Sequence, residues 1–161
     1  MRQLWAPWRM EYIDSGDRKV DSCIFCVKAS EDRDAENYVL YRSAFCFVMM
    51  NLYPYNNGHL MVAPYQHMPD IEALSPDVLA DIMTTTQKCL SALRGAMAPH
   101  GFNMGINQGA VAGAGITDHV HMHIVPRWNG DTNFMPVLAD VKVMPQHLTK
   151  TYQSIRKFLS Q

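Results

Sequence analysis

Histidine alternates with apolar residues in the segment Asp118-His119-Val120-His121-Met122-His123-Ile124-Val125-Pro126-Arg127. This alternation predicts a β-strand over 119–125, because successive side chains of a strand point to opposite faces of its sheet. His119, His121 and His123 then share one face, and the apolar residues between them share the other. We expect the apolar face to enter the core and the histidine face to carry chemistry.

The spacing leaves three chemistries open for the histidine face. Successive imidazoles on it are separated by about 6.5–7 Å between Cα atoms, close enough to share an ion or a substrate. The face is compatible with a metal site, with a general acid–base pair, or with a histidine nucleophile that attacks phosphorus. A surface strand without function would also show three histidines, but the strict alternation with apolar residues disfavours it.

Further strands are predicted on both sides of the long helix that is expected to begin at Ser75 and Pro76. Strand-forming residues occur at 38–41, 45–50 and 59–63, and again at 102–107. Pro and an Asn-Gly pair within 51–58 mark a turn, so the second and third runs are expected to form an antiparallel hairpin.

Two amphipathic helices complete the pattern. Ser75 and Pro76 supply an N-cap and a first helical residue. The apolar face of this helix is predicted to hold Leu79, Ile82, Met83, Thr86, Leu90, Leu93 and Met97. A C-terminal helix is indicated by Leu148, Tyr152, Ile155 and Leu159. The segment 28–36 is expected to be a surface loop or short helix, and 109–115 a flexible loop. This order of elements favours the α+β class with an antiparallel sheet.

Length and composition fit one domain over 1–161, with an N-terminal extension over 1–36, a catalytic core over 37–128, and a C-terminal segment and helix over 129–161. Hydrophobic residues make up 48% of the chain, which excludes global disorder. The net charge of −1 gives no strong field toward nucleic acid or an anionic membrane, and neither partner is expected. Without a signal peptide or spanning segment, a cytoplasmic location with reduced thiols is expected.

Cys23 and Cys26 have the spacing of one half of a zinc site, and the segment between them is Ile24-Phe25. A tetrahedral ion needs two further ligands, which the spacing alone does not identify. A redox pair requires a thioredoxin-like βαβ context, which the surrounding sequence lacks. The spacing is also compatible with two thiols that share no function.

The pattern His-Val-His-Met-His-Ile-Val at 119–125 resembles the histidine triad (HIT) superfamily of nucleotide hydrolases and transferases. The similarity covers most of the chain. It includes Asn51, the stretch Gly58-His59-Leu60-Met61-Val62-Ala63-Pro64, and Gln108 ahead of the glycine-rich loop. Together these features are far more specific than the three histidines alone.

The resemblance implies a homodimer of α+β subunits, each with a five-stranded antiparallel sheet, a long central helix and a C-terminal helix. It also implies an adenine nucleotide substrate whose α-phosphate lies over the triad, with magnesium as a possible companion. His121 is then the nucleophile that forms a nucleotidyl-histidine intermediate, His123 contacts the phosphate, and His59 supports the nucleophile. The implied substrate-binding residues are Asn51, Gln108, Gly115, Thr117 and His123.

One part of the loop before the triad departs from the family. Many HIT proteins carry Gln followed by Ser or Thr there, whereas this chain has Gly115 and Ile116. In those proteins these polar side chains donate hydrogen bonds to the phosphate or the leaving group. In this chain that role then passes to backbone N–H groups, to Thr117 or to another segment. This loop, the exit 126–128, the segment 130–134 and the N-terminal 8–12 are similar to the branch that contains diadenosine tetraphosphate phosphorylases.

In zinc-containing HIT proteins the cysteine pair is completed by a histidine after the Gly-His strand and by the first histidine of the triad. The resemblance therefore implies a site made of Cys23, Cys26, His67 and His119. Four protein ligands leave no open position on the ion, which makes the site structural.

The favoured function is the cleavage of dinucleoside polyphosphates, or of related adenosine 5′-phosphate esters and amidates, at the α-phosphorus through His121. A phosphorylase that uses phosphate as the acceptor is the second enzymatic hypothesis. Two further hypotheses are a regulatory protein that binds nucleotides without turnover, and a catalytic metal site on the histidine face.

Overall fold

The computed structural model describes residues 23–131 and 146–159. The motif 8–12 and residues 132–134, on which part of the resemblance depends, lie outside these residues. Within the described residues no helix has both the length and the apolar run needed to cross a bilayer.

The sheet is antiparallel and five-stranded, as expected. Its strands in spatial order are β1 (Val39–Arg42), β2 (Cys46–Met50), β3 (Leu60–Pro64), β5 (Met122–Arg127) and β4 (Gly101–Ile106). The predicted hairpin is confirmed, because β2 pairs with β3 from Cys46 opposite Pro64 to Met50 opposite Leu60. Strand β5 lies between β3 and β4 and so brings the histidine segment beside the hairpin.

In the part of the chain that the structure describes, three α-helices surround the sheet: α2 (Ile24–Ser30), α3 (Pro76–Met97) and α5 (Leu148–Leu159). The 3-10 turns η2 (Ile71–Ala73) and η3 (Ala110–Ala112) lie in the connections. The Ser75 hydroxyl accepts the Val78 N–H at 3.4 Å, so the predicted start of α3 is confirmed. The segment 109–115 is not wholly irregular, because η3 forms within it.

The predicted apolar face of α3 was wrong at Met83, which is 53% exposed. The buried stripe instead includes Val78, Thr85, Cys89 and Ala92. Small and polar residues are tolerated there because their polar atoms are satisfied: Thr86 donates to the Ile82 carbonyl at 2.8 Å, for example. Apolar periodicity therefore located the helix but misplaced one edge of its buried face.

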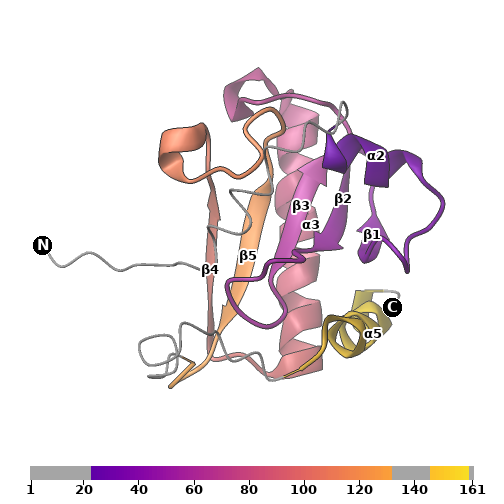
Figure 1. The fold of residues 1–161 in the computed structure, drawn as a ribbon, viewed down its shortest axis with the longest axis vertical. Coiled ribbons are helices and arrows are strands. Elements are labelled where there is room, and N and C mark those ends of the chain that lie inside the picture. The colour runs from indigo at the N-terminus through magenta and orange to yellow at the C-terminus, as the bar shows by residue number, and fades with distance from the viewer. Residues whose placement is uncertain (1–22, 132–145, 160–161) are drawn as a thin grey trace, which may run out of the picture.

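Apolar side chains fill both faces of the sheet. Helices α3 and α5 cover one face, and Figure 1 shows α3 running behind β2 and β3 with α5 beside β1. On the opposite face Phe25 of α2 joins a second cluster with Phe47, Met49 and Met61. All residues of β2 and β3 are buried, because each strand is covered on both sides.

Strand β5 begins later than the sequence predicts. Its ladder starts at Met122, so His119 and His121 precede it. The Val120 N–H donates instead to the Met68 carbonyl at 2.7 Å, outside the sheet ladder. The alternation still holds, since Val120 and Ile124 enter the core on the α3 side.

Candidate functional site

Three histidine rings meet beside the start of β5. The ring centroids of His121 and His123 are 4.6 Å apart, and those of His59 and His123 are 5.1 Å apart. His119 contributes the first residue of the triad but points its ring toward α2. The structure therefore brings His59, His121 and His123 together as one cluster.

The His121 ring is held in a defined orientation. It is only 5% exposed, and its Nδ1 lies 2.9 Å from the carbonyl oxygen of His119. A carbonyl only accepts, so Nδ1 carries the proton and donates it. Burial lowers the pKa of the His121 ring, which favours the neutral imidazole. Its Nε2 is then unprotonated and has the lone pair that a nucleophile needs.

The protons of His59 and His123 follow from the same reasoning. The backbone N–H of Tyr55 donates to Nδ1 of His59 at 3.0 Å, so that nitrogen is an acceptor. Nε2 of His59 then carries the proton and donates it to Nδ1 of His123, 3.0 Å away. As a consequence, Nε2 of His123 is the protonated nitrogen of its ring. This arrangement makes His123 a hydrogen-bond donor suited to an anionic oxygen.

The loop between β2 and β3 supports this chain of hydrogen bonds. Asn56 is buried and donates to the Pro126 carbonyl at 3.1 Å and to Asp131 at 2.8 Å. The ring of Tyr55 stacks on His59 with centroids 5.1 Å apart. The loop is therefore fixed to the end of β5 where it presents the Tyr55 N–H to His59.

The predicted substrate-binding residues occupy different places. Asn51 lies at the histidine cluster, with Nδ2 3.4 Å from Nδ1 of His59. Gln108 instead directs both ends of its amide to η2: it accepts from the Ile71 N–H at 3.0 Å and donates to Glu72 at 3.0 Å. Gly115 and Thr117 are exposed in the loop that leads to His119.

Sequence reasoning missed two aromatic residues of this site. Phe25 lies against the rings of both His119 and His121, and Tyr55 stacks on His59. Phe25 stands between the two cysteines, but nothing in the sequence pairs it with a residue almost a hundred positions later. Tyr55 follows Pro54 in a segment that reads only as a turn.

A second cluster gathers the donors Cys23, Cys26, His67 and His119. Each residue offers one ligand atom, and these atoms all lie within 4.8 Å of one another. Nδ1 of His119 is 3.3 Å from Sγ of Cys23 and 3.6 Å from Sγ of Cys26, and Nδ1 of His67 is 3.4 Å from Sγ of Cys26. Ligands on a tetrahedral zinc ion have sulfur and nitrogen atoms about 3.6 Å apart. The donor types and spacings both fit such an ion.

The other nitrogens of the two imidazoles have partners suited to metal ligands. Nε2 of His119 lies 2.9 Å from the Pro64 carbonyl, and Nε2 of His67 lies 3.8 Å from a carboxylate oxygen of Asp118. Outer partners of this kind fix the tautomer that leaves Nδ1 free to bind a metal. Burial lowers the pKa of His119, which favours the neutral form that a ligand requires.

The family model of the HIT domain matches residues 32–130 of the chain. The chain belongs to the HIT family. The matched range contains all five strands and α3 of this HIT protein, while Cys23 and Cys26 precede it. The α+β fold expected from the resemblance is therefore confirmed. The expected homodimer stays a prediction, because the structure describes a single chain.

Known proteins of the family resemble this HIT protein over different lengths. It is 38% identical over 157 residues to the AP-4-A phosphorylase of Mycobacterium tuberculosis, covering 94% of this chain and 80% of that protein. It is 33% identical over 93 residues to a bis(5'-nucleosyl)-tetraphosphatase [asymmetrical] of Schizosaccharomyces pombe, covering 58% and 50%. A Zn-bound histidine triad family protein of Mycobacterium smegmatis superposes with a TM-score of 0.70 at 26% identity, covering 87% and 94%.

Proposed function

We propose that this HIT protein is an enzyme that cleaves dinucleoside polyphosphates, or related adenosine 5′-phosphate esters and amidates, at the α-phosphorus. His121 is the nucleophile. The observation that carries the proposal is the hydrogen bond from Nδ1 of His121 to the His119 carbonyl, which leaves Nε2 unprotonated beside His123. The relatives named for diadenosine tetraphosphate phosphorolysis and for nucleosyl-tetraphosphate cleavage support the substrate class.

The reaction proceeds in two displacements at phosphorus. The lone pair on Nε2 of His121 forms an N–P bond, while the P–O bond to the leaving polyphosphate breaks and its electron pair stays on the leaving oxygen. An acceptor oxygen then attacks the same phosphorus, and the N–P electron pair returns to Nε2. Two lower barriers replace one high barrier, because neutral imidazole is both a good nucleophile and a good leaving group.

The surrounding residues have separate roles in this proposal. The Nε2–H of His123 donates to an oxygen of the α-phosphate, and His59 holds the His123 ring in the tautomer that allows it. Asn51 binds ribose hydroxyls beside His59. Gly115 and Thr117 offer backbone N–H groups and a hydroxyl to the phosphates or the leaving group. Gln108 remains a predicted contact that has to exchange its bonds with η2 to reach a substrate.

Phosphate is the acceptor that the comparisons favour. The relative named AP-4-A phosphorylase matches 94% of this chain, whereas the relative named as a tetraphosphatase matches 58%. Chromatography of the products from diadenosine tetraphosphate, with and without inorganic phosphate, tests this choice. ADP and ATP formed only with phosphate support a phosphorylase. AMP and ATP formed without phosphate indicate a hydrolase, and nucleotide binding without either product indicates a regulatory protein.

A structural zinc ion is the proposed occupant of Cys23, Cys26, His67 and His119. Two thiolates and two imidazoles would complete a tetrahedral coordination without an open position, so the ion stabilises the fold and does not activate water. The Zn-bound relative supports the identity of the metal. Magnesium that accompanies a nucleotide substrate stays a prediction from the resemblance.

The sheet edge supports the proposed homodimer. Within the described residues β4 pairs only with β5, and Met104 on β4 is 52% exposed. Exposed edge strands offer backbone donors and acceptors to a second chain. Light scattering after size-exclusion chromatography measures the mass of the assembly against the 18.3 kDa of one chain. A monomer at micromolar concentration contradicts the proposal. The cytoplasmic location stays a prediction from the sequence.

A further inference from the structure

Helix α2 presents one aromatic ring to the histidine cluster. Phe25 is fully buried, and its ring centroid lies 4.7 Å from that of His121 and 5.1 Å from that of His119. It therefore contacts both the residue proposed as the nucleophile and a residue of the Cys/His cluster. Phe25 also packs on Phe47 edge-on at 6.4 Å, within the core on that face of the sheet.

The start of α2 is fixed by the Cys/His cluster. Cys23 is the N-cap of the helix and Cys26 lies in its first turn, and both thiols approach Nδ1 of His119. Phe25 stands between the two cysteines, so any ion bound by this cluster restrains the backbone on either side of its ring.

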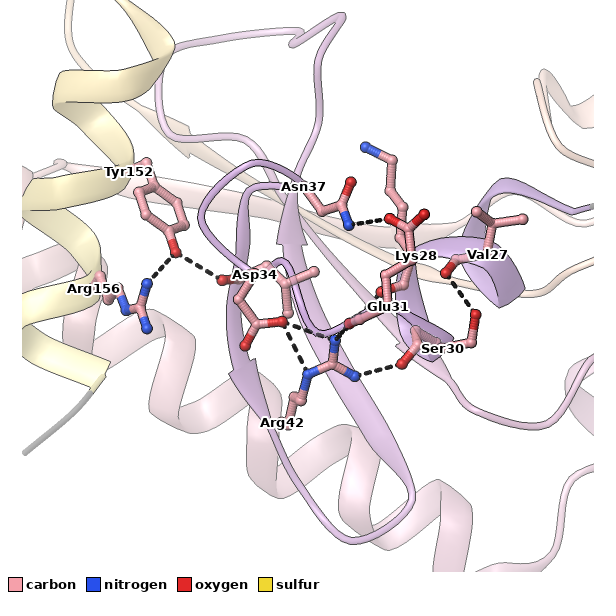
Figure 2. A network of polar contacts seen from close by, with 11 residues as sticks. Val27, Lys28, Ser30, Glu31, Asp34, Asn37, Arg42, Tyr152 and Arg156 are labelled. Atoms are coloured by element: carbon pink, nitrogen blue, oxygen red, sulfur yellow. Dashed lines mark hydrogen bonds and ion pairs between the residues drawn. The ribbon is translucent and has the colours of Figure 1, made fainter.

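The end of α2 is fixed by Arg42 of β1, as Figure 2 shows. The guanidinium donates to the carbonyls of Ala29 at 2.6 Å, Glu31 at 3.0 Å and Lys28 at 3.3 Å. Asp34 holds the guanidinium in place through contacts of 2.8 and 3.1 Å. A cation at the last carbonyls of a helix satisfies acceptors that have no partner within the helix.

We propose that Phe25 is a positioning residue for His121, held against the nucleophile by a helix that is anchored at one end by the Cys/His cluster and at the other by Arg42. This inference rests on the proposed function of His121. The hydrogen bond to the His119 carbonyl fixes one edge of the His121 ring. Contact with Phe25 fixes the tilt of the ring about that bond and so directs Nε2 at phosphorus.

Substitution of Phe25 by Leu removes the ring but keeps an apolar side chain of related size. We expect kcat to fall by about 10- to 100-fold, because misplacing a reacting atom by about 1 Å has effects of that order. KM should stay within about twofold, because the Phe25 ring is fully buried and therefore does not contact a bound substrate. The metal content should remain that of the wild-type protein.

Phe47→Leu is the matched control, because it makes the same change in the same apolar cluster. Among the described residues, the ring of Phe47 contacts those of Phe25 at 6.4 Å and Tyr65 at 5.7 Å, and the ring of Phe25 lies between it and His121 in this series of contacts. A second pair tests the far end of the helix if Phe25→Leu fails to fold. Arg42→Lys loses the branched contacts to the α2 carbonyls, whereas the exposed Arg33→Lys changes only bonds to Glu31 and Glu36. We expect Arg42→Lys to lower kcat and Arg33→Lys to leave it unchanged.

NMR of the imidazole carbon and proton signals supplies a measurement that does not depend on turnover. The signals of His121, assigned with His121→Ala, should shift in Phe25→Leu and in Arg42→Lys but stay in place in both controls. The inference is overturned if the His121 signals do not move, if Phe25→Leu and Phe47→Leu lower kcat equally, or if KM rises while kcat is kept. If the wild-type protein shows no turnover, only the proposed function is refuted. The NMR shifts still test whether Phe25 positions the His121 ring.

Discussion

The carbonyl oxygen of His119 accepts the Nδ1 proton of His121 at 2.9 Å, while the side chain of His119 belongs to the cluster with Cys23 and Cys26. One residue therefore joins the proposed metal site to the proposed nucleophile through its backbone. Any movement of the His119 main chain changes the direction of Nε2 of His121. A metal ion that never touches the substrate can affect turnover by this route.

His121→Ala is expected to lower kcat on diadenosine tetraphosphate by at least about a thousandfold, because no other group in the cluster replaces the missing nucleophile. Nucleotide affinity should change only a few-fold, since the phosphate and ribose contacts come from other residues. Steady-state kinetics and calorimetric binding measure the two quantities. His147→Ala, at an exposed position before α5, is the control. Normal turnover in His121→Ala refutes the proposed mechanism.

Cys23→Ser is expected to lose the metal and to unfold at a temperature lower by about 10 °C or more, because a structural ion contributes its binding free energy to folding. Metal analysis and thermal unfolding measure these effects. Cys89→Ala also removes a thiol, but from the core beneath α3, so it should keep the metal. Equal metal content in Cys23→Ser and Cys89→Ala is the result that excludes the proposed ligand set.

The thiols of Cys46 and Cys89 are expected to be unreactive in the native protein. Burial raises the pKa of the Cys89 thiol to about 12 and raises that of Cys46 as well. At pH 8 only about one Cys89 in ten thousand is then a thiolate, which is the reactive form. A colorimetric thiol reagent should label all four cysteines in denaturant but neither of these two in the folded chain. Rapid labelling of Cys89 before unfolding contradicts this expectation.

Gly58→Ala is expected to destabilise the protein by about 1–3 kcal/mol. Gly58 has φ of +74°, and an added Cβ would lie 2.7 Å from the Met97 sulfur at the end of α3. Relief of that contact requires a shift of the Met97 side chain or of the loop that carries His59. Gly101→Ala is the control, because nothing lies within 4 Å of a Cβ added there. Urea unfolding compares the two, and equal stabilities contradict the strain argued here.

Most elements of this fold follow from the sequence alone, although helix α2 begins at Ile24, ahead of the segment 28–36 that was expected to form a loop or short helix. Alternation, turn residues and caps located the strands, the β2–β3 hairpin and the long helix, because these signals act between residues close along the chain. The HIT resemblance supplied the hypotheses that spacing left open, namely the proposed metal ligands and the proposed role of His121. The errors were local: Met83 was assigned to the buried face of α3, and β5 was expected to begin at His119 rather than Met122.

Packing of the folded chain fixes which imidazole nitrogens carry protons and what holds His121, the proposed nucleophile. The tautomers of His59 and His121 depend on the Tyr55 N–H and the His119 carbonyl, whose directions follow from the backbone path and not from residue type. Phe25 meets His121 only because α2 folds back over the sheet. Contacts between residues so far apart in the chain depend on the packing of whole elements, and local patterns of hydrophobicity do not encode that packing.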